Sequence, residues 1–140
     1  MKNALSVCVV DDEPSNRSTM GMMLRAMGFE KIHEFSNAPE ALHFIQENAT
    51  HLIVSDWNME PMSGLELLNE VRSNRTLTGI PFVMVTANKS ENYWCDAIMA
   101  GVSEFLFKPY SFSAFRGAVL TGLGLENRSD GVLPINSRVA

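Results

Sequence analysis

Polar side chains with reactive groups follow four of the five short apolar runs in the sequence. These residues are Asp11 and Asp12 after the first run, Asp56 after the third, Thr86 after the fourth and Lys108 after the fifth. If the runs are parallel strands, their carboxyl ends meet at one edge of the sheet, where open sheets of this kind bind their ligands. The pattern therefore predicts three carboxylates, a hydroxyl and an ammonium group in one crevice.

Three carboxylates in one crevice require a cation. Two unit charges 4 Å apart repel by about 4 kcal/mol at an effective dielectric constant near 20. Carboxylate oxygens are hard ligands, and Mg²⁺ binds proteins through a few of them together with the oxygens of a phosphate. We therefore expect Mg²⁺ beside Asp11, Asp12 and Asp56.

A carboxylate in such a site can attack phosphorus and form an acyl phosphate. In that reaction Asp56 is the expected nucleophile, and Lys108 and the metal neutralise the phosphoryl oxygens. Thr86 is expected to donate a hydrogen bond to a third oxygen, together with backbone N–H groups at the start of the next helix. The predicted chemistry is phosphoryl transfer to Asp56.

The elements that would position these residues alternate along the chain. Apolar runs of strand length occupy residues 5–10, 31–35, 52–55, 80–85 and 104–107. Between and after them, apolar residues recur at helical spacing: Met20, Met23, Leu24 and Met27; Ala38, Ala41, Leu42 and Ile45; Leu65, Leu68 and Val71; Trp94, Ala97 and Ile98; and Phe112, Phe115 and Val119. The sequence predicts an α/β protein with a doubly wound, five-stranded parallel sheet and helices on both faces.

Local signals place the ends of several helices. Asn37 and Ser63 are each followed three residues later by glutamate, as in a capping box, and Gly28 is placed to end the first helix. Trp57 is expected to be a partly exposed residue at the rim of the site, and Trp94 is expected to pack on the fourth helix.

One domain accounts for residues 1–124, and a tail accounts for residues 125–140. The tail is polar and has no hydrophobic period, which predicts disorder.

Composition narrows the setting in which this domain acts. The formal charge is −5 and there is no basic run, so direct binding to nucleic acid is not expected. The apolar segments are too short to insert into a membrane. The two cysteines, Cys8 and Cys95, are too few for a disulfide framework, which favours the cytoplasm.

Taken in order, the motifs resemble those of the bacterial two-component response-regulator receiver domain. They are Val9-Val10-Asp11-Asp12, Asp56-Trp57-Asn58-Met59, Gly64, Thr86-Ala87 and Lys108-Pro109. The resemblance covers roughly residues 4–124, and the segment from Asp56 to Leu68 is most similar to the stand-alone chemotaxis-type regulator.

This resemblance implies a flavodoxin-like fold and a set of roles for the site residues. Asp56 would be phosphorylated by a sensor histidine kinase or a histidine phosphotransfer protein, with Mg²⁺ bound by Asp12, Asp56 and the backbone carbonyl of Asn58. Asp11 would bind the metal through water. Such a domain is a signalling switch and not an enzyme in the usual sense.

The resemblance also implies how the signal leaves the site. Thr86 and the aromatic residue Phe105 would form a coupled switch, and Lys108 and Pro109 would be joined by a cis peptide bond. The receiving partner would be a protein effector, with a flagellar switch protein as the first candidate.

The chain departs from the chemotaxis pattern at three positions. Glu60 stands where a proline is usual, Phe105 where tyrosine is frequent, and Asn88 where an acid is found.

Two other functions fit part of the pattern. A haloacid-dehalogenase-type phosphohydrolase also uses an aspartate nucleophile with Mg²⁺, but it carries an acid two residues later, where this chain has Asn58. A receiver-like module that binds a partner without being phosphorylated is the second alternative. Considered singly, Asp11 and Asp12 could be an acidic helix start, and Thr86 could be a helix N-cap.

Overall fold

The computed structural model describes the backbone of residues 2–128 and 131–134 and the side chains of residues 3–125. The described elements are a short 3-10 helix at Lys2–Ala4, then β1 (Ser6–Val10), α1 (Pro14–Ala26), β2 (Lys31–Phe35), α2 (Ala38–Glu47), β3 (Leu52–Asp56), α3 (Gly64–Ser73), β4 (Phe82–Thr86), α4 (Glu91–Ala100), β5 (Glu104–Phe107), α5 (Phe112–Gly122), β6 (Leu125–Arg128) and β7 (Gly131–Pro134). Among the described helices none is long and apolar enough to cross a membrane.

The central sheet has five parallel strands in the order β2-β1-β3-β4-β5. The chain runs from β1 to one neighbour, β2, and then returns to the other side of β1 to form β3. Loops after β1 and β3 therefore diverge, which opens a crevice at their carboxyl ends. The predicted α/β fold with a doubly wound five-stranded sheet is confirmed.

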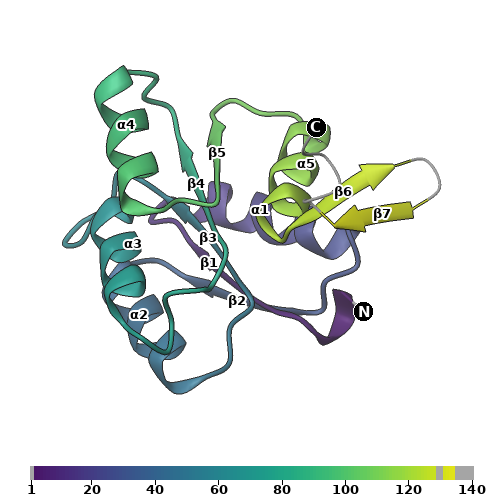
Figure 1. Ribbon diagram of the computed structural model, residues 1–140, viewed down its shortest axis with the longest axis horizontal. Helices are drawn as coiled ribbons and strands as arrows, with labels where there is room; N and C mark the ends of the chain where they lie inside the picture. Colours follow the sequence, from purple (N-terminus) through teal and green to yellow (C-terminus); the bar gives the residue numbers. More distant parts are fainter. Residues whose placement is uncertain (1, 129–130, 135–140) are drawn as a thin grey trace.

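Helices cover both faces of this sheet (Figure 1). Alternate strand residues point to opposite faces, so Val7 and Val9 pack with α1 and α5, whereas Cys8 and Val10 pack with α2, α3 and α4. Every residue of β1, β3 and β4 is buried. This double burial explains why the strands are apolar runs without alternation.

Capping residues mark the starts or ends of several helices at the positions that the sequence predicts. Ser63 and Glu66 form a full capping box at the start of α3. At the start of α2 the side chain of Asn37 accepts a hydrogen bond from the backbone N–H of Glu40. Gly28 follows α1 with a φ of 106°, a conformation that glycine adopts without steric cost.

The predictions for the two tryptophans are wrong, and two other apolar residues of the helical stripes are exposed. Trp57 is only 5% exposed, whereas Trp94 and Ile98 are about half exposed on α4 and Phe112 is 40% exposed on α5. The helical spacing in α4 and α5 is real, but only part of each stripe meets the sheet. Trp57 is buried because it turns under α4 and stacks on Tyr93.

The predicted tail includes two short strands in the part that the structure describes. Leu125–Arg128 and Gly131–Pro134 pair as an antiparallel ribbon beside α5 (Figure 1). Backbone hydrogen bonds across a short ladder need no hydrophobic alternation, which is why composition does not reveal them. Residues 129–130 and 135–140 lie outside the described part of the chain.

Candidate functional site

The carboxylates of the site lie at the ends of β1 and β3, the two strands that flank the crevice. Asp56 is the last residue of β3, and Asp11 and Asp12 follow β1 directly. Asp11 is fully buried, Asp56 is 7% exposed and Asp12 faces solvent. One oxygen from each of the three carboxylates lies within 4.8 Å of the others.

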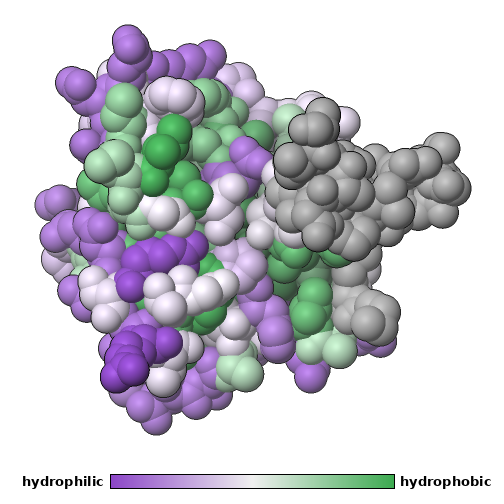
Figure 2. All heavy atoms as spheres, in the orientation of Figure 1, coloured by the Kyte–Doolittle hydropathy of each residue, from purple (hydrophilic) through white to green (hydrophobic). Residues whose placement is uncertain are grey.

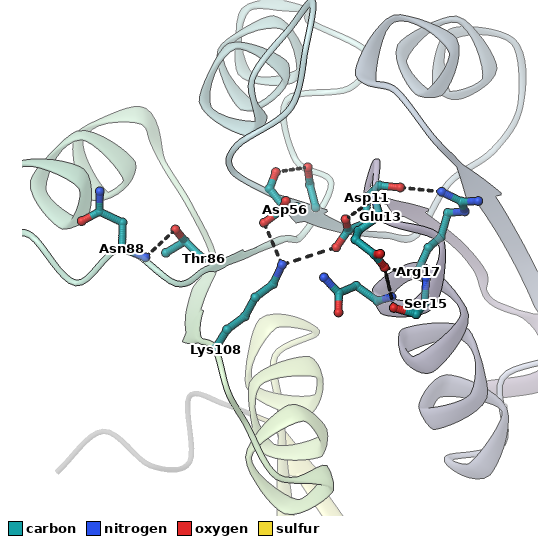
Figure 3. A network of polar contacts seen from close by, with 10 residues as sticks. Asp11, Glu13, Ser15, Arg17, Asp56, Thr86, Asn88 and Lys108 are labelled. Carbon is teal, nitrogen blue, oxygen red and sulfur yellow. Dashed lines mark hydrogen bonds and ion pairs between the residues drawn. The ribbon is translucent and has the colours of Figure 1, made fainter.

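Lys108 reaches into this cluster from the end of β5, at the edge of the sheet (Figure 3). Its ammonium group donates a hydrogen bond to Asp56 Oδ1 at 3.2 Å and lies 3.6 Å from Asp11 Oδ2. Its backbone N–H donates to the carbonyl of Thr86 at 2.8 Å, which fixes the strand end. The Lys108–Pro109 peptide bond is cis, and so is Glu60–Pro61 in the loop after β3.

Burial and charge act in opposite directions on the two buried carboxylates. Desolvation raises the pKa of Asp56, and the nearby Lys108 opposes that rise. Desolvation is also the main cause that raises the pKa of Asp11, with a further contribution from the charge of Asp56. One ammonium group therefore offsets only part of the cost of holding these charges out of water.

The donor set fits a divalent cation. Asp11 Oδ2 is buried and accepts no hydrogen bond from the described residues, so its charge lacks full compensation. Asp12 lines a cavity of about 330 Å³ together with Asn58, the residue expected to offer its carbonyl. These are hard oxygen donors beside open space, which is the setting that Mg²⁺ requires.

Thr86 ends β4 and is fully buried. Its hydroxyl accepts a hydrogen bond from the backbone N–H of Asn88 at 3.1 Å (Figure 3). The helix that follows begins later, with Ser90 as its N-cap. The expectation that helix-start N–H groups adjoin Thr86 is therefore wrong, and so is the alternative that Thr86 is itself a helix cap.

Glu13, and neither Asp11 nor Asp12, caps the start of α1. Its side chain accepts hydrogen bonds from the backbone N–H groups of Ser15 and Asn16, as an N-cap does. Asp11 instead accepts from the N–H of Glu13 through Oδ1. Asp11 and Asp12 are left to face the crevice.

Phe105 lies on β5, half-buried under α4, as part of a row of aromatic rings. Its ring centroid is 6.1 Å from that of Trp57 and 5.2 Å from that of Phe107. Trp57 in turn stacks on Tyr93, with the ring centroids 4.3 Å apart and an angle of 18° between the ring planes. Tyr93 is not anticipated from the sequence, because no short-range pattern links residues this far apart.

Two further residues support the site, and sequence reasoning misses the first of them. Arg17 donates from Nη1 to the backbone carbonyl of Asp11 at 2.7 Å and holds that strand end in place. Gly64 begins α3 so close to the acceptor strand that an added Cβ would lie 2.2 Å from the carbonyl oxygen of Asp56. Gly64 is among the motif residues of the sequence, whereas its close approach to Asp56 is seen only in the structure.

Comparison with known proteins agrees with this geometry. Residues 7–120 match the response regulator receiver domain family. The chain is 32% identical over 124 residues to the chemotaxis protein CheY1 of Helicobacter pylori, an alignment that covers 88% of this chain and 100% of that protein. It is 29% identical over 112 residues to the chemotaxis protein CheY-3 of Vibrio cholerae serotype O1, covering 80% of this chain and 86% of that protein.

Solved structures show the same similarity. The chemotaxis protein CheY4 of Vibrio cholerae superposes with a TM-score of 0.74 at 28% identity, covering 80% of this chain and 92% of that one. The family match spans most of the chain, and the buried acidic cluster with its lysine lies inside the matched segment. This chain belongs to the response regulator receiver domain family.

Proposed function

We propose that this receiver domain takes a phosphoryl group on Asp56 from a sensor histidine kinase or a histidine phosphotransfer protein. The observation that carries the proposal is the position of Lys108 Nζ, 3.2 Å from Asp56 Oδ1 and 3.6 Å from Asp11 Oδ2. A cation held there neutralises both the nucleophile and the phosphoryl oxygens as charge develops.

The transfer is a displacement at phosphorus. A carboxylate oxygen of Asp56 forms the new O–P bond while the bond from phosphorus to the donor nitrogen or oxygen breaks, and the donor leaves with the electron pair. Lys108 holds the acceptor carboxylate in its ionised form and compensates the incoming oxygens. Lys108 therefore both orients the nucleophile and stabilises the product.

Mg²⁺ is the proposed cofactor, since receiver domains bind it at an acidic pocket and this chain has one. Asp12, Asp56 and the backbone carbonyl of Asn58 would hold it, with Asp11 acting through water. When bound, the ion supplies positive charge to the phosphoryl oxygens. Thr86 would donate its hydroxyl proton to the phosphoryl group, and a rotation of its side chain toward Asp56 would break the hydrogen bond that its oxygen accepts from the N–H of Asn88.

A phosphodonor protein would dock beside the lysine. A groove of about 420 Å³ runs between the start of α1 and the loop that follows β5, next to Lys108. Its described lining residues are Asn16, Thr19, Met23, Ala87, Lys108, Pro109 and Tyr110. A donor histidine placed at that groove would lie beside Lys108, whose ammonium group contacts Asp56 and Asp11.

The output surface is proposed to be formed by α4, β5 and α5. Trp94 and Ile98 are about half exposed there, Met99 is 86% exposed, and Figure 2 shows apolar surface over α4 and toward β5. An apolar patch of this kind is typical of a protein-binding surface. The chemotaxis relatives make a flagellar switch protein the first candidate for the effector, and the cytoplasm is the proposed location.

Intact mass after incubation with Mg²⁺ and acetyl phosphate tests this function. We expect the wild-type chain to gain the mass of one phosphoryl group, and we expect Asp56→Asn to gain none because the nucleophile is gone. Asp96→Asn removes an exposed aspartate of α4 and serves as the matched control, which should be labelled like the wild type. A chelator should prevent labelling throughout.

The alternatives predict different outcomes of the same experiment. If neither wild type nor Asp96→Asn gains mass, the chain is a receiver-like binding module. Continuous turnover of a phosphate ester would indicate a phosphohydrolase, although Asn58 at the general-acid position opposes that reaction.

A further inference from the structure

Helix α4 is anchored to the rest of the domain mainly at its two ends. Ala97 is the buried residue of its ten, whereas α3, of the same length, buries four. Three large apolar side chains on α4, Trp94, Ile98 and Met99, are exposed. Since little apolar area fixes the middle of the helix, the contacts at its ends decide where it lies.

The C-terminal end of α4 is held by Arg72 of α3. Its guanidinium group donates to the carbonyl of Gly101 at 2.8 Å and to the carbonyls of Thr78 and Ile80 at 2.8 and 2.7 Å. These hydrogen bonds tie the end of α4 to the loop before β4. This end is therefore the more firmly fixed of the two.

The N-terminal end is held by the stack of Tyr93 on Trp57. The ring planes differ by 18°, with centroids 4.3 Å apart, and Trp57 is buried next to Asp56. The backbone N–H of Trp57 donates to the carbonyl of Val85, so this ring is carried by the sheet itself. Tyr93 thus joins a weakly packed helix to the residue that follows the phosphoacceptor.

A series of hydrogen bonds connects Thr86 to the same tyrosine. The Thr86 hydroxyl accepts from the N–H of Asn88, and the Asn88 side chain accepts from the N–H of Ser90. The Ser90 hydroxyl in turn accepts from the N–H of Tyr93 at 3.5 Å. If the Thr86 side chain rotates so that its oxygen moves toward a phosphoryl group, that oxygen leaves the N–H of Asn88, and the other two hydrogen bonds lose their fixed position.

From these contacts we infer that Tyr93 is a positioning residue that holds the N-terminal turn of α4 against Trp57 until Asp56 is phosphorylated. Release of the stack lets α4 move about its Arg72-bound end and rearranges the exposed apolar face. The inference rests on the proposed function and adds a named contact through which phosphorylation reaches the output surface. It requires two arrangements of α4 whose populations the phosphoryl group shifts.

The test is an equilibrium titration with beryllofluoride and Mg²⁺, a non-covalent stand-in for the phosphoryl group. Trp94→Phe leaves Trp57 as the fluorescent reporter, since the chain has two tryptophans. In that background Tyr93→Ala should bind the probe about 2- to 13-fold more tightly, the range that corresponds to the strength of an aromatic pair. Hydrogen exchange in the first turn of α4 should become faster before any probe is added.

Two further variants show whether loss of the ring stack causes the tighter binding of the probe. Tyr93→Phe keeps the ring and should bind the probe like the parent, whereas Asn92→Ala removes an exposed neighbour on the same turn and should also change nothing. Unchanged or weaker binding by Tyr93→Ala, or an equal shift in either control, would overturn the inference. Failure of the parent itself to bind the probe would instead count against the proposed function.

Discussion

At the scale of single residues, the site holds two buried carboxylates with one ammonium group between them. Asp11 has the less favourable position, because Oδ2 is buried without a hydrogen-bond donor among the described residues and Lys108 is closer to Asp56. An unsatisfied buried charge lowers the stability of the folded state. The buried carboxylate of Asp11 thus lowers the stability of the fold, and a bound cation would offset that cost.

Asp11→Asn should raise the free energy of unfolding by about 1 to 3 kcal/mol in Mg²⁺-free buffer at neutral pH, because a neutral amide replaces a buried charge that Lys108 compensates only in part. The pKa of Asp11 is raised above the unfolded value of 3.8, so the folded state binds the proton more tightly. Stability of the wild type therefore falls as the pH rises through that window, and the advantage of Asp11→Asn should shrink in acid. Urea unfolding at several pH values measures both effects.

Asp96→Asn is the control for this comparison, because Asp96 is exposed and its replacement should change stability by less than about 0.5 kcal/mol. A wild type more stable than Asp11→Asn at neutral pH would show that the carboxylate is compensated after all.

At the scale of elements, the three strands that carry Asp11, Asp56 and Thr86 could be predicted because they are buried on both sides. Their apolar runs leave no alternative to a covered parallel sheet, and the site residues follow from where the runs end. The exposure of apolar side chains on α4 could not be predicted in the same way. The helical spacing is typical of a buried stripe, yet Trp94 and Ile98 face solvent because the helix meets the sheet through Ala97.

Helix α3 is placed by Gly64, and this contact gives a prediction about the acceptor loop. An alanine Cβ at that position would lie 2.2 Å from the Asp56 carbonyl oxygen and 2.9 Å from Met84 Sδ. The backbone must shift, so Gly64→Ala should lower the free energy of unfolding by about 1 to 3 kcal/mol. It should also slow labelling of Asp56 by acetyl phosphate, as measured by intact mass.

Gly117→Ala is the matched control. Gly117 lies inside α5 with no atom within 4 Å of an added Cβ. Alanine is the better helix former, so this change should stabilise the domain by about 0.5 to 1 kcal/mol and leave labelling unaltered. Equal effects of the two substitutions would argue against close packing at Gly64.

At the scale of the whole molecule, the site depends on contacts that local patterns do not contain. The stack of Tyr93 on Trp57 joins positions far apart in the sequence, and the burial of Trp57 follows from it. The ribbon of Leu125–Arg128 and Gly131–Pro134 depends on backbone pairing. The sequence predicts the sheet and the polar residues at its carboxyl edge, whereas tertiary packing decides which aromatic rings are buried.

Binding of Mg²⁺ should stabilise the whole domain, because a ligand that binds only the folded state adds its binding free energy to folding. At an ion concentration 100 times the dissociation constant, the expected gain is about 2.7 kcal/mol. Thermal unfolding with increasing MgCl₂ measures it, and NaCl at equal ionic strength corrects for screening. Asp12→Asn should lose most of the gain, and a full gain in that variant would remove Asp12 from the metal site.

Asp56 and its lysine are 52 positions apart, and they meet only after β5 has paired with β4. A ribosome releases the acceptor long before it releases the group that completes the acceptor's surroundings. A half-made chain therefore displays Asp56 without the ammonium group on which the proposed phosphoryl transfer depends. Under the proposed function, only a chain whose sheet is complete would be phosphorylated on Asp56, so chains still being synthesised would not transmit the signal.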